Sequence, residues 1–186
     1  MKVTPLAIPD LLLLEPVRHG DSRGFFSEVW SRRALADAGI AAEFVQDNHA
    51  ASASRHVLRG LHFQRPPHAQ GKLIRVARGA ILDIAVDIRE GSPTYGEHVA
   101  IEISAANWLQ LWVPRGFAHG YLTLEPETEV LYKTDAYYAR EADAAIRWDD
   151  PTLGIAWPVA GPVLSDKDRA APLLAEIEPP FPRGSW

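Results

Sequence analysis

Residues able to move protons lie in two neighbouring segments that otherwise have the composition of buried β-strands. Residues 57–64 contain Arg59 and His62, and residues 71–76 contain Lys72. Burying an unpaired charge costs several kcal/mol, so such groups usually belong to a functional site. A histidine base beside two cations suits the removal of a proton from carbon, because the cations stabilise the negative charge that develops.

His62 needs an orienting partner if it acts as a base. A carboxylate fixes the tautomer of the imidazole and raises its basicity, and Asp166 and Asp168 are both candidates. Taken alone, a histidine in a strand is more often a packed residue. In a regular strand Arg59 would point to the opposite face from His62, unless Gly60 interrupts the alternation.

Tyr132 lies in residues 129–133, directly after the apolar pair Val130 and Leu131. Without further information, a packed core tyrosine is the simpler interpretation. The functional interpretation is a phenolic acid that returns a proton to carbon.

Length and composition indicate one soluble globular domain over residues 1–186, with 47% hydrophobic and 23% charged residues. The net charge of −5 argues against nucleic acid as the main partner. The absence of cysteine excludes disulfides and thiolate catalysis. The apolar run 11–14 is too short for a signal peptide or a membrane span, so we expect a cytoplasmic protein.

The patterning predicts a mainly β protein, a jelly roll with one short helix near residues 31–39. Ser31 is a suitable N-cap for that helix and Gly39 a suitable stop. Turn-forming residues separate many short strands, as in a sandwich or barrel. Residues 149–186 are proline-rich and are expected to cover the barrel as irregular structure. Alternating residues predict strands at 82–88, a half-buried one, and at 99–103, 108–113 and 129–133.

The segment Pro114-Arg-Gly-Phe-Ala-His119 resembles the second motif of the cupin superfamily, whose histidine is a ligand in metal-binding members. The first cupin motif would supply two further histidines and a glutamate. Here Gln64 stands in place of the second histidine and Lys72 in place of the glutamate. An ammonium group repels a divalent cation, so we expect a cupin cavity without a metal, in which Lys72 replaces the cation.

A set of ordered motifs is similar to the dTDP-4-dehydrorhamnose 3,5-epimerase family. That resemblance implies a jelly roll, a homodimer formed partly by strand exchange, and no metal or organic cofactor. It implies inversion of C3 and C5 in a thymidine-diphosphate sugar that carries a ketone at C4. The motifs are Asp21-Ser-Arg-Gly-Phe-Phe-Ser-Glu28, Gln46-Asp-Asn48, Arg59-Gly-Leu-His-Phe-Gln64, Pro114-Arg-Gly-Phe-Ala-His119, Tyr132-Lys-Thr134, Tyr137-Tyr138 and Leu164-Ser-Asp-Lys-Asp168.

The resemblance also implies a role for each site residue. His62 becomes the base oriented by Asp168, Lys72 stabilises the enolate oxygen, and Tyr132 reprotonates carbon from the opposite face. Arg23, Arg59 and Lys167 match positions that bind the pyrophosphate, and Tyr138 matches one that stacks on thymine. The other substrate-binding positions implied are Phe26, Glu28, Gln46, Asn48, His119 and Asp143, the last replacing a more common glutamate.

Three alternatives remain open at this point. A sister enzyme on the same scaffold could invert only C3 or only C5. A metal-dependent cupin oxygenase would use His62, His68 and His119, but Gln64 and Lys72 argue against it. A non-catalytic sugar-binding cupin should lack a complete set of base and acid.

Overall fold

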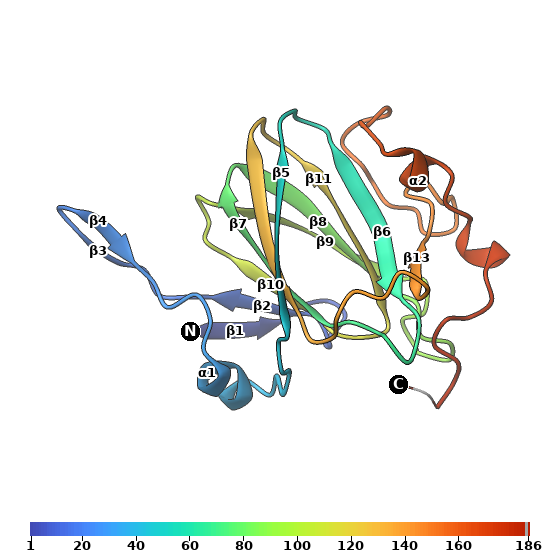
Figure 1. Cartoon of the computed structure of the whole chain (residues 1–186), viewed down its shortest axis with the longest axis horizontal. Helices are drawn as coiled ribbons and strands as arrows, with labels where there is room; N and C mark the ends of the chain where they lie inside the picture. The colour runs from blue at the N-terminus through green and yellow to red at the C-terminus, as the bar shows by residue number, and fades with distance from the viewer. Residues whose placement is uncertain (185) are drawn as a thin grey trace.

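Residues 1–184 and 186, which the computed structural model describes, form two antiparallel β-sheets that face each other (Figure 1). The prediction of a mainly β sandwich is confirmed. One sheet has the strand order β1 (Lys2–Pro5), β2 (Leu12–Glu15), β10 (Gln110–Val113), β7 (Lys72–Arg78), β12 (Thr128–Thr134) and β5 (Gln46–Ser52). The other has the order β13 (Asp143–Ala145), β6 (Leu58–Gln64), β11 (Phe117–Thr123), β8 (Ala80–Asp87) and β9 (His98–Ser104).

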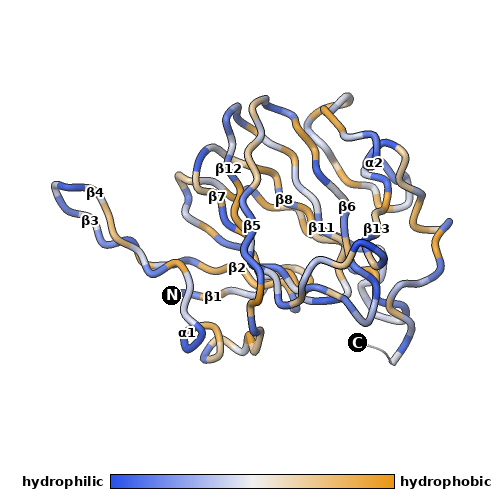
Figure 2. Tube along the Cα trace, viewed as in Figure 1, coloured by the Kyte–Doolittle hydropathy of each residue, from blue (hydrophilic) through white to orange (hydrophobic). Residues whose placement is uncertain are grey.

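The core lies between the two sheets and is filled by alternate residues of facing strands. Ile74 and Val76 of β7 meet Ile81 and Ala85 of β8 there, all at most 2% exposed. Successive residues of a strand point to opposite faces, so period-two patterning supplies one apolar face to each sheet. Figure 2 shows the resulting mixture of hydrophobic and hydrophilic positions along the strands.

The prediction of a half-buried strand at residues 82–88 is wrong, because β8 is buried on both faces. Asp83 and Asp87, which we expected to face water, are 0% exposed. The outer face of this sheet is covered by the C-terminal part of the chain, which packs against Ile84 and Val86. The covering residues include Leu153, Leu174 and Phe181. The polar positions of β8 therefore point into the molecule.

Short helices flank the sheets. The predicted helix is present as α1 (Arg32–Asp37), with the Ser31 hydroxyl accepting a hydrogen bond from the Ala34 amide and Gly39 at a φ of 83°. The expectation of irregular structure after residue 149 missed α2 (Asp166–Arg169) and the 3₁₀ helix η1 (Leu174–Glu176). One-turn helices are too short to show a hydrophobic period. No helix in the described residues is long and apolar enough to span a bilayer.

A hairpin of β3 (His19–Asp21) and β4 (Gly24–Phe26) projects away from both sheets (Figure 1). Its aromatic residues are exposed, Phe25 by 53% and Phe26 by 72%. The guanidinium of Arg18 lies 4.3 Å from the Phe25 ring and 4.5 Å from the Trp108 ring, which ties the base of the hairpin to the sheets. An isolated hairpin is only marginally stable. We therefore expect another protein surface to cover the exposed apolar residues of this one.

Candidate active site

A cavity of about 410 Å³ opens between the two sheets. Its walls come from β5, β6, β7, β11 and β12, and residues 163–168 close one side. This size is typical of pockets for small organic ligands. The titratable side chains that line it are Arg59, His62, Lys72, His119, Tyr121, Tyr132, Lys167 and Asp168. The sequence predicted all of these except Tyr121.

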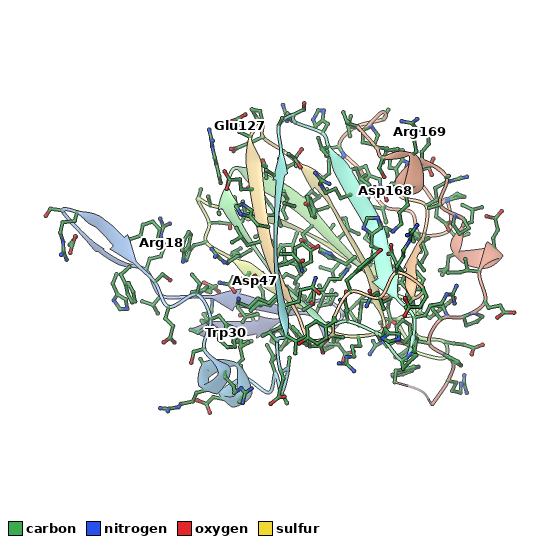
Figure 3. All side chains as sticks on the ribbon, in the orientation of Figure 1. Arg18, Trp30, Asp47, Glu127, Asp168 and Arg169 are labelled. Carbon is green, nitrogen blue, oxygen red and sulfur yellow. The ribbon has the colours of Figure 1, made fainter. Side chains whose placement is uncertain are left out.

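His62 and Asp168 form a carboxylate–histidine pair at the cavity wall, with 2.5 Å between Nε2 and Oδ1. Figure 3 shows Asp168 on α2 beside β6, with Arg169 next to it at the outer side. Burial would raise the pKa of Asp168, but hydrogen bonds from His62 and Ser165 bring it below its ordinary value. A proton held at Nε2 by this ionised carboxylate leaves Nδ1 of His62 free to accept another.

The other candidate orienter, Asp166, takes no part in the site. Its side chain is fully exposed and pairs with Arg169 over 3.6 Å. The difference arises in α2, where the Ser165 hydroxyl caps the helix by accepting a hydrogen bond from the Asp168 amide over 3.1 Å. The cap fixes which of the two carboxylates turns inward.

Both Arg59 and His62 face the cavity, although they are three positions apart along the strand. The alternation of β6 breaks at Gly60, and the register with β11 shifts between the pairs Arg59–Tyr121 and His62–His119. Gly60 has a φ of +146°, and a Cβ there would lie 2.5 Å from the Cα of Gly120. Only glycine fits so close to a neighbouring strand in this conformation. The irregularity therefore brings a cation and a base into one cavity.

Lys72 is 9% exposed and donates a hydrogen bond to the backbone carbonyl of His62 over 3.2 Å. Burial lowers its pKa to about 8, while the carboxylates of Asp83 and Asp143 act in the opposite direction. The side chain therefore keeps its proton at neutral pH. A buried ammonium beside a base can stabilise negative charge on a ligand oxygen.

His119 is also buried, and its Nε2 lies 2.8 Å from Oδ1 of Asp83. We expected His119 to contact ligand, and it does line the cavity, as one member of a second carboxylate–histidine pair. Asp83 is a site residue that the sequence reasoning missed. The available signal was that Asp83 has an apolar residue on each side in its strand. Alternation along the strand nevertheless suggested that Asp83 faces solvent.

Tyr132 projects into the cavity from β12, in the sheet opposite to the one that carries His62. Burial raises its pKa above the ordinary value for a phenol. It therefore stays protonated at neutral pH. The base and the phenol stand on opposite walls of one cavity.

Five of the predicted substrate-binding residues lie together beside the cavity. The side-chain oxygen of Gln46 accepts a hydrogen bond from the Tyr138 amide over 3.0 Å, and its nitrogen donates to Asn48 over 2.8 Å. The Tyr138 hydroxyl donates to Asp143 over 3.1 Å, and Lys167 pairs with the same carboxylate. The ring of Tyr138 is exposed, so its face is free for stacking.

Three predicted site residues do not reach the cavity of their own chain. Arg23 and Phe26 lie on the projecting hairpin, and Glu28 follows it. The Arg23 side chain is 87% exposed, and its guanidinium pairs with Asp21 over 2.5 Å. None of the three lines the pocket that contains His62.

Of the three histidines of the metal alternative, His62 and His119 line the same cavity, but His68 does not. His62 pairs with Asp168 and His119 with Asp83, whereas His68 lies 3.7 Å from Glu141 in a half-exposed pair. Within the part of the chain that the structure describes, no group of three His, Cys, Asp or Glu side chains is placed to hold a metal ion. The ligand set required by an oxygenase is therefore not formed.

Comparison with known proteins identifies the family. The sequence model of dTDP-4-dehydrorhamnose 3,5-epimerase matches residues 5–176. The chain belongs to the dTDP-4-dehydrorhamnose 3,5-epimerase family. The enzyme of that name from Salmonella typhimurium is 51% identical over 176 residues, covering 94% of this chain and 96% of that protein. This level of identity over nearly the whole length makes the chain an isomerase with 3,5-epimerase activity.

Solved structures of the epimerase family agree in fold. The Bacillus anthracis epimerase with TDP and PPi bound has a TM-score of 0.91 at 49% identity, covering 92% of this chain and 98% of that one. The Legionella pneumophila epimerase in complex with dTDP-4-keto-L-rhamnose has a TM-score of 0.91 at 43% identity, covering 95% and 94%. The predicted jelly roll of the epimerases is thus confirmed.

Proposed function

We propose that the protein converts dTDP-4-dehydro-6-deoxy-D-glucose to dTDP-4-dehydro-L-rhamnose with His62 as base and Tyr132 as acid. The hydrogens at C3 and C5 are both α to the C4 ketone, so removing either one gives an enolate. The observation that carries these roles is the position of His62 and Tyr132 on opposite walls of one cavity. Inversion requires proton removal from one face of the sugar and return from the other.

The other polar groups of the cavity complete the mechanism. Asp168 orients His62 and stabilises the imidazolium that forms when Nδ1 takes the proton. Lys72 faces the C4 oxygen and stabilises the enolate. Because the ammonium is already in place and buried, it needs no reorganisation as the charge develops.

We assign the nucleotide end of the substrate to the group beside the cavity. Arg59 and Lys167 bind the diphosphate, for which a guanidinium fork and an ammonium group are suited. The exposed ring of Tyr138 stacks on thymine. Gln46, Asn48 and Asp143 hold the base and sugar or position Tyr138. Gln46 and Asp143 are hydrogen-bonded to Tyr138, and Asn48 is hydrogen-bonded to Gln46.

Incubation of the keto sugar nucleotide with the enzyme in deuterated water tests the reaction. Proton NMR and mass spectrometry should find deuterium at both C3 and C5 in a product of rhamno configuration. Label at one carbon alone would identify a single-site epimerase. Absence of label despite intact binding would reject the proposed chemistry.

Lys72 sets the alkaline limit of activity under this mechanism. Its ammonium loses the proton as the pH rises through about 8, so kcat/KM should fall about tenfold per pH unit above that value. The limit is measured as kcat/KM against pH, with the deuterium incorporation assay as readout. Unchanged activity up to pH 10 would exclude Lys72 as the electrostatic catalyst.

The same lysine should affect stability in the opposite direction. The pKa of Lys72 is about 8 in the folded state, below the value of 10.5 for a free lysine. Between these values the unfolded chain binds more protons, so the contribution of Lys72 to the free energy of unfolding increases with pH. Lys72→Met should remove this increase in thermal unfolding experiments, which separates the titration of Lys72 from that of other groups.

We further propose a homodimer in which the β3–β4 hairpin enters the cavity of the partner subunit. The hairpin exposes Phe25 and Phe26 and extends away from its own sheets (Figure 1). Arg23 and Glu28 match ligand-binding positions, but neither lines the cavity of its own chain. Exchange of the hairpin would bury the aromatic rings and deliver Arg23 to the diphosphate of the neighbouring site.

Mixing two inactive variants should restore activity if the hairpin is exchanged. A heterodimer of His62→Ala with Arg23→Ala/Phe26→Ala has one site made only of intact residues. Random reassociation makes half of the dimers mixed, so activity should return to about a quarter of the wild-type value. His62→Ala mixed with Tyr132→Phe is the control, since both changes lie in the cavity of their own chain. No restoration in the first mixture would contradict the exchange.

We infer that the protein works in the cytoplasm as a single domain over residues 1–186. Its substrate is a multiply charged nucleotide sugar, which does not cross a membrane unaided. The cavity also draws residues from β5 to α2, so these segments belong to one folded unit.

A further inference from the structure

Residues 135–142 connect the two sheets, leaving β12 of the six-stranded sheet and entering β13 of the five-stranded sheet. The structure describes all of these residues, and they form no strand or helix. The segment carries Tyr138, whose exposed ring we assign to thymine. An irregular segment lacks the regular hydrogen bonds of a sheet, so other partners must hold it in one conformation. Three glutamine side chains supply such partners for residues 136–139.

Gln64 holds the segment on both sides of Tyr138. Its side-chain nitrogen donates to the backbone carbonyl of Tyr137 over 3.2 Å, and its oxygen accepts from the Ala139 amide over 2.7 Å. The nitrogen also donates to the carbonyl of His68 over 2.6 Å, and the side chain is 4% exposed. Loss of this side chain would leave the buried Ala139 amide without a partner, a cost that the segment can avoid only by moving.

Two further glutamines hold neighbouring backbone groups of the same segment. Gln70 donates to the carbonyl of Ala136 over 2.8 Å, and Gln46 accepts from the Tyr138 amide over 3.0 Å. Of the three glutamines, only Gln64 is buried, and only Gln64 bonds to backbone groups on both sides of Tyr138. Gln64 is therefore the main anchor of the segment.

Gln64 also connects the segment to the strand that carries the base. Gln64 and His62 are two positions apart on β6, so their side chains leave the strand on the same face. Gln64 does not line the cavity, and the partner of the His62 ring is Asp168. Gln64 stands where the cupin pattern has a second histidine. Its three hydrogen bonds use two donors and an acceptor, which a neutral imidazole does not offer.

We propose that Gln64 is a positioning residue for the nucleotide, which fixes residues 137–139 so that the ring of Tyr138 is held in place to stack on the base. This inference rests on the proposed function and deepens it. Gln64 touches no part of the substrate and acts only through Tyr138. Its effect is therefore expected in the affinity for dTDP and in KM, and not in kcat.

Gln64→Met tests this role, because methionine fills a similar volume without hydrogen-bonding the three backbone groups. The dissociation constant of dTDP, measured by calorimetry, should rise about tenfold, within the range for losing one base–aromatic stack. KM should rise with it, while kcat stays within about threefold of wild type. Gln64→Glu has the same shape but no N–H donor, and it should weaken dTDP in the same way if the methionine variant does not fold.

Thr128→Val is the matched control. Thr128 is a fully buried residue of β12 that holds a different turn, since its hydroxyl donates to the carbonyl of Glu125 over 2.8 Å. It does not line the cavity. This variant should lower the melting temperature as Gln64→Met does, but leave the affinity for dTDP unchanged. An equal weakening of dTDP in both variants would assign the effect to general destabilisation and overturn the proposed role.

A double-mutant cycle with Tyr138→Ala shows whether Gln64 acts through that ring. Tyr138→Ala should weaken dTDP about tenfold or more, and adding Gln64→Met should weaken it by less than about threefold further. Losses that multiply fully, or a fall in kcat at unchanged KM, would overturn the role of Gln64.

Failure of the proposed stacking gives a different result from failure of the positioning role. If Tyr138→Ala binds dTDP like wild type, the assignment of Tyr138 to thymine is wrong, and the role of Gln64 is rejected with it. If Tyr138→Ala weakens dTDP and Gln64→Met does not, the stacking stands and only the role of Gln64 is rejected.

Discussion

Replacing His62 by alanine is expected to abolish epimerisation while dTDP still binds with nearly wild-type affinity. The imidazole is the base in the site, and Asp168 has no function in proton transfer without it. Loss of a general base typically lowers the rate about 10²–10⁴-fold. The groups assigned to the nucleotide are other side chains: Arg59, Lys167, and residues of β5 and the 138–143 segment. Turnover and dTDP affinity are measured separately, by NMR and by calorimetry.

His68→Ala is the matched control for this variant. His68 is a half-exposed histidine paired with Glu141, outside the cavity, and its removal should leave turnover unchanged. If the metal alternative were correct, His62→Ala, His68→Ala and His119→Ala would all lose activity together. Normal turnover by His62→Ala would show that another group is the base. Asp168→Asn should fall between wild type and His62→Ala, because the base remains but its orientation and charge stabilisation are lost.

Local patterns predicted the elements that carry the chemistry. Alternation over β9 and β12 is visible within each segment, and so is the N-cap Ser31 of α1. His62 and Lys72 were identifiable because burying an ionisable side chain in an apolar strand costs free energy, which indicates a functional role. The resemblance to the epimerases supplied roles for Tyr132 and Asp168 that composition alone left open.

Contacts between distant segments set the limit of sequence prediction. Asp168 reaches His62 across 106 residues, and only the fold distinguishes it from Asp166. Asp83 was misjudged because alternation identifies two faces of a strand but not what covers them. The C-terminal segment covers one face of β8, and the core between the sheets covers the other. The inward turn of Arg59 depends on the close approach of Gly60 to a neighbouring strand.

The β3–β4 hairpin shows a second limit of prediction from sequence. Its motif predicted ligand-binding roles for Arg23 and Phe26, yet the fold of one chain leaves both exposed and remote from the cavity. A motif records which residues meet a ligand but not which subunit supplies them. This mismatch between motif and position is the reason for proposing an exchanged dimer.

Tyr132→Phe should separate proton exchange from inversion. His62 can still form the enolate in this variant, because Lys72 remains in place to stabilise it. The imidazolium exchanges its proton with solvent and returns a deuteron to the face it came from. The substrate should therefore gain deuterium at C3 or C5 with retained configuration, while inverted product falls about 10²-fold or more. Mass spectrometry measures the label, and NMR coupling constants report the configuration.

Lys72→Met provides the contrast that makes this test specific. Without the ammonium the enolate itself is not stabilised, so exchange and inversion should fall together, by about 10²–10³-fold. A Tyr132→Phe enzyme that loses exchange as fully as Lys72→Met would show that Tyr132 acts before the enolate forms. One that inverts normally would require another acid on the same wall, where Lys72 is the other titratable group of the cavity. If Tyr132→Phe retains deuterium exchange but loses inversion, His62 acts on one face of the sugar and Tyr132, from the opposite sheet, acts on the other.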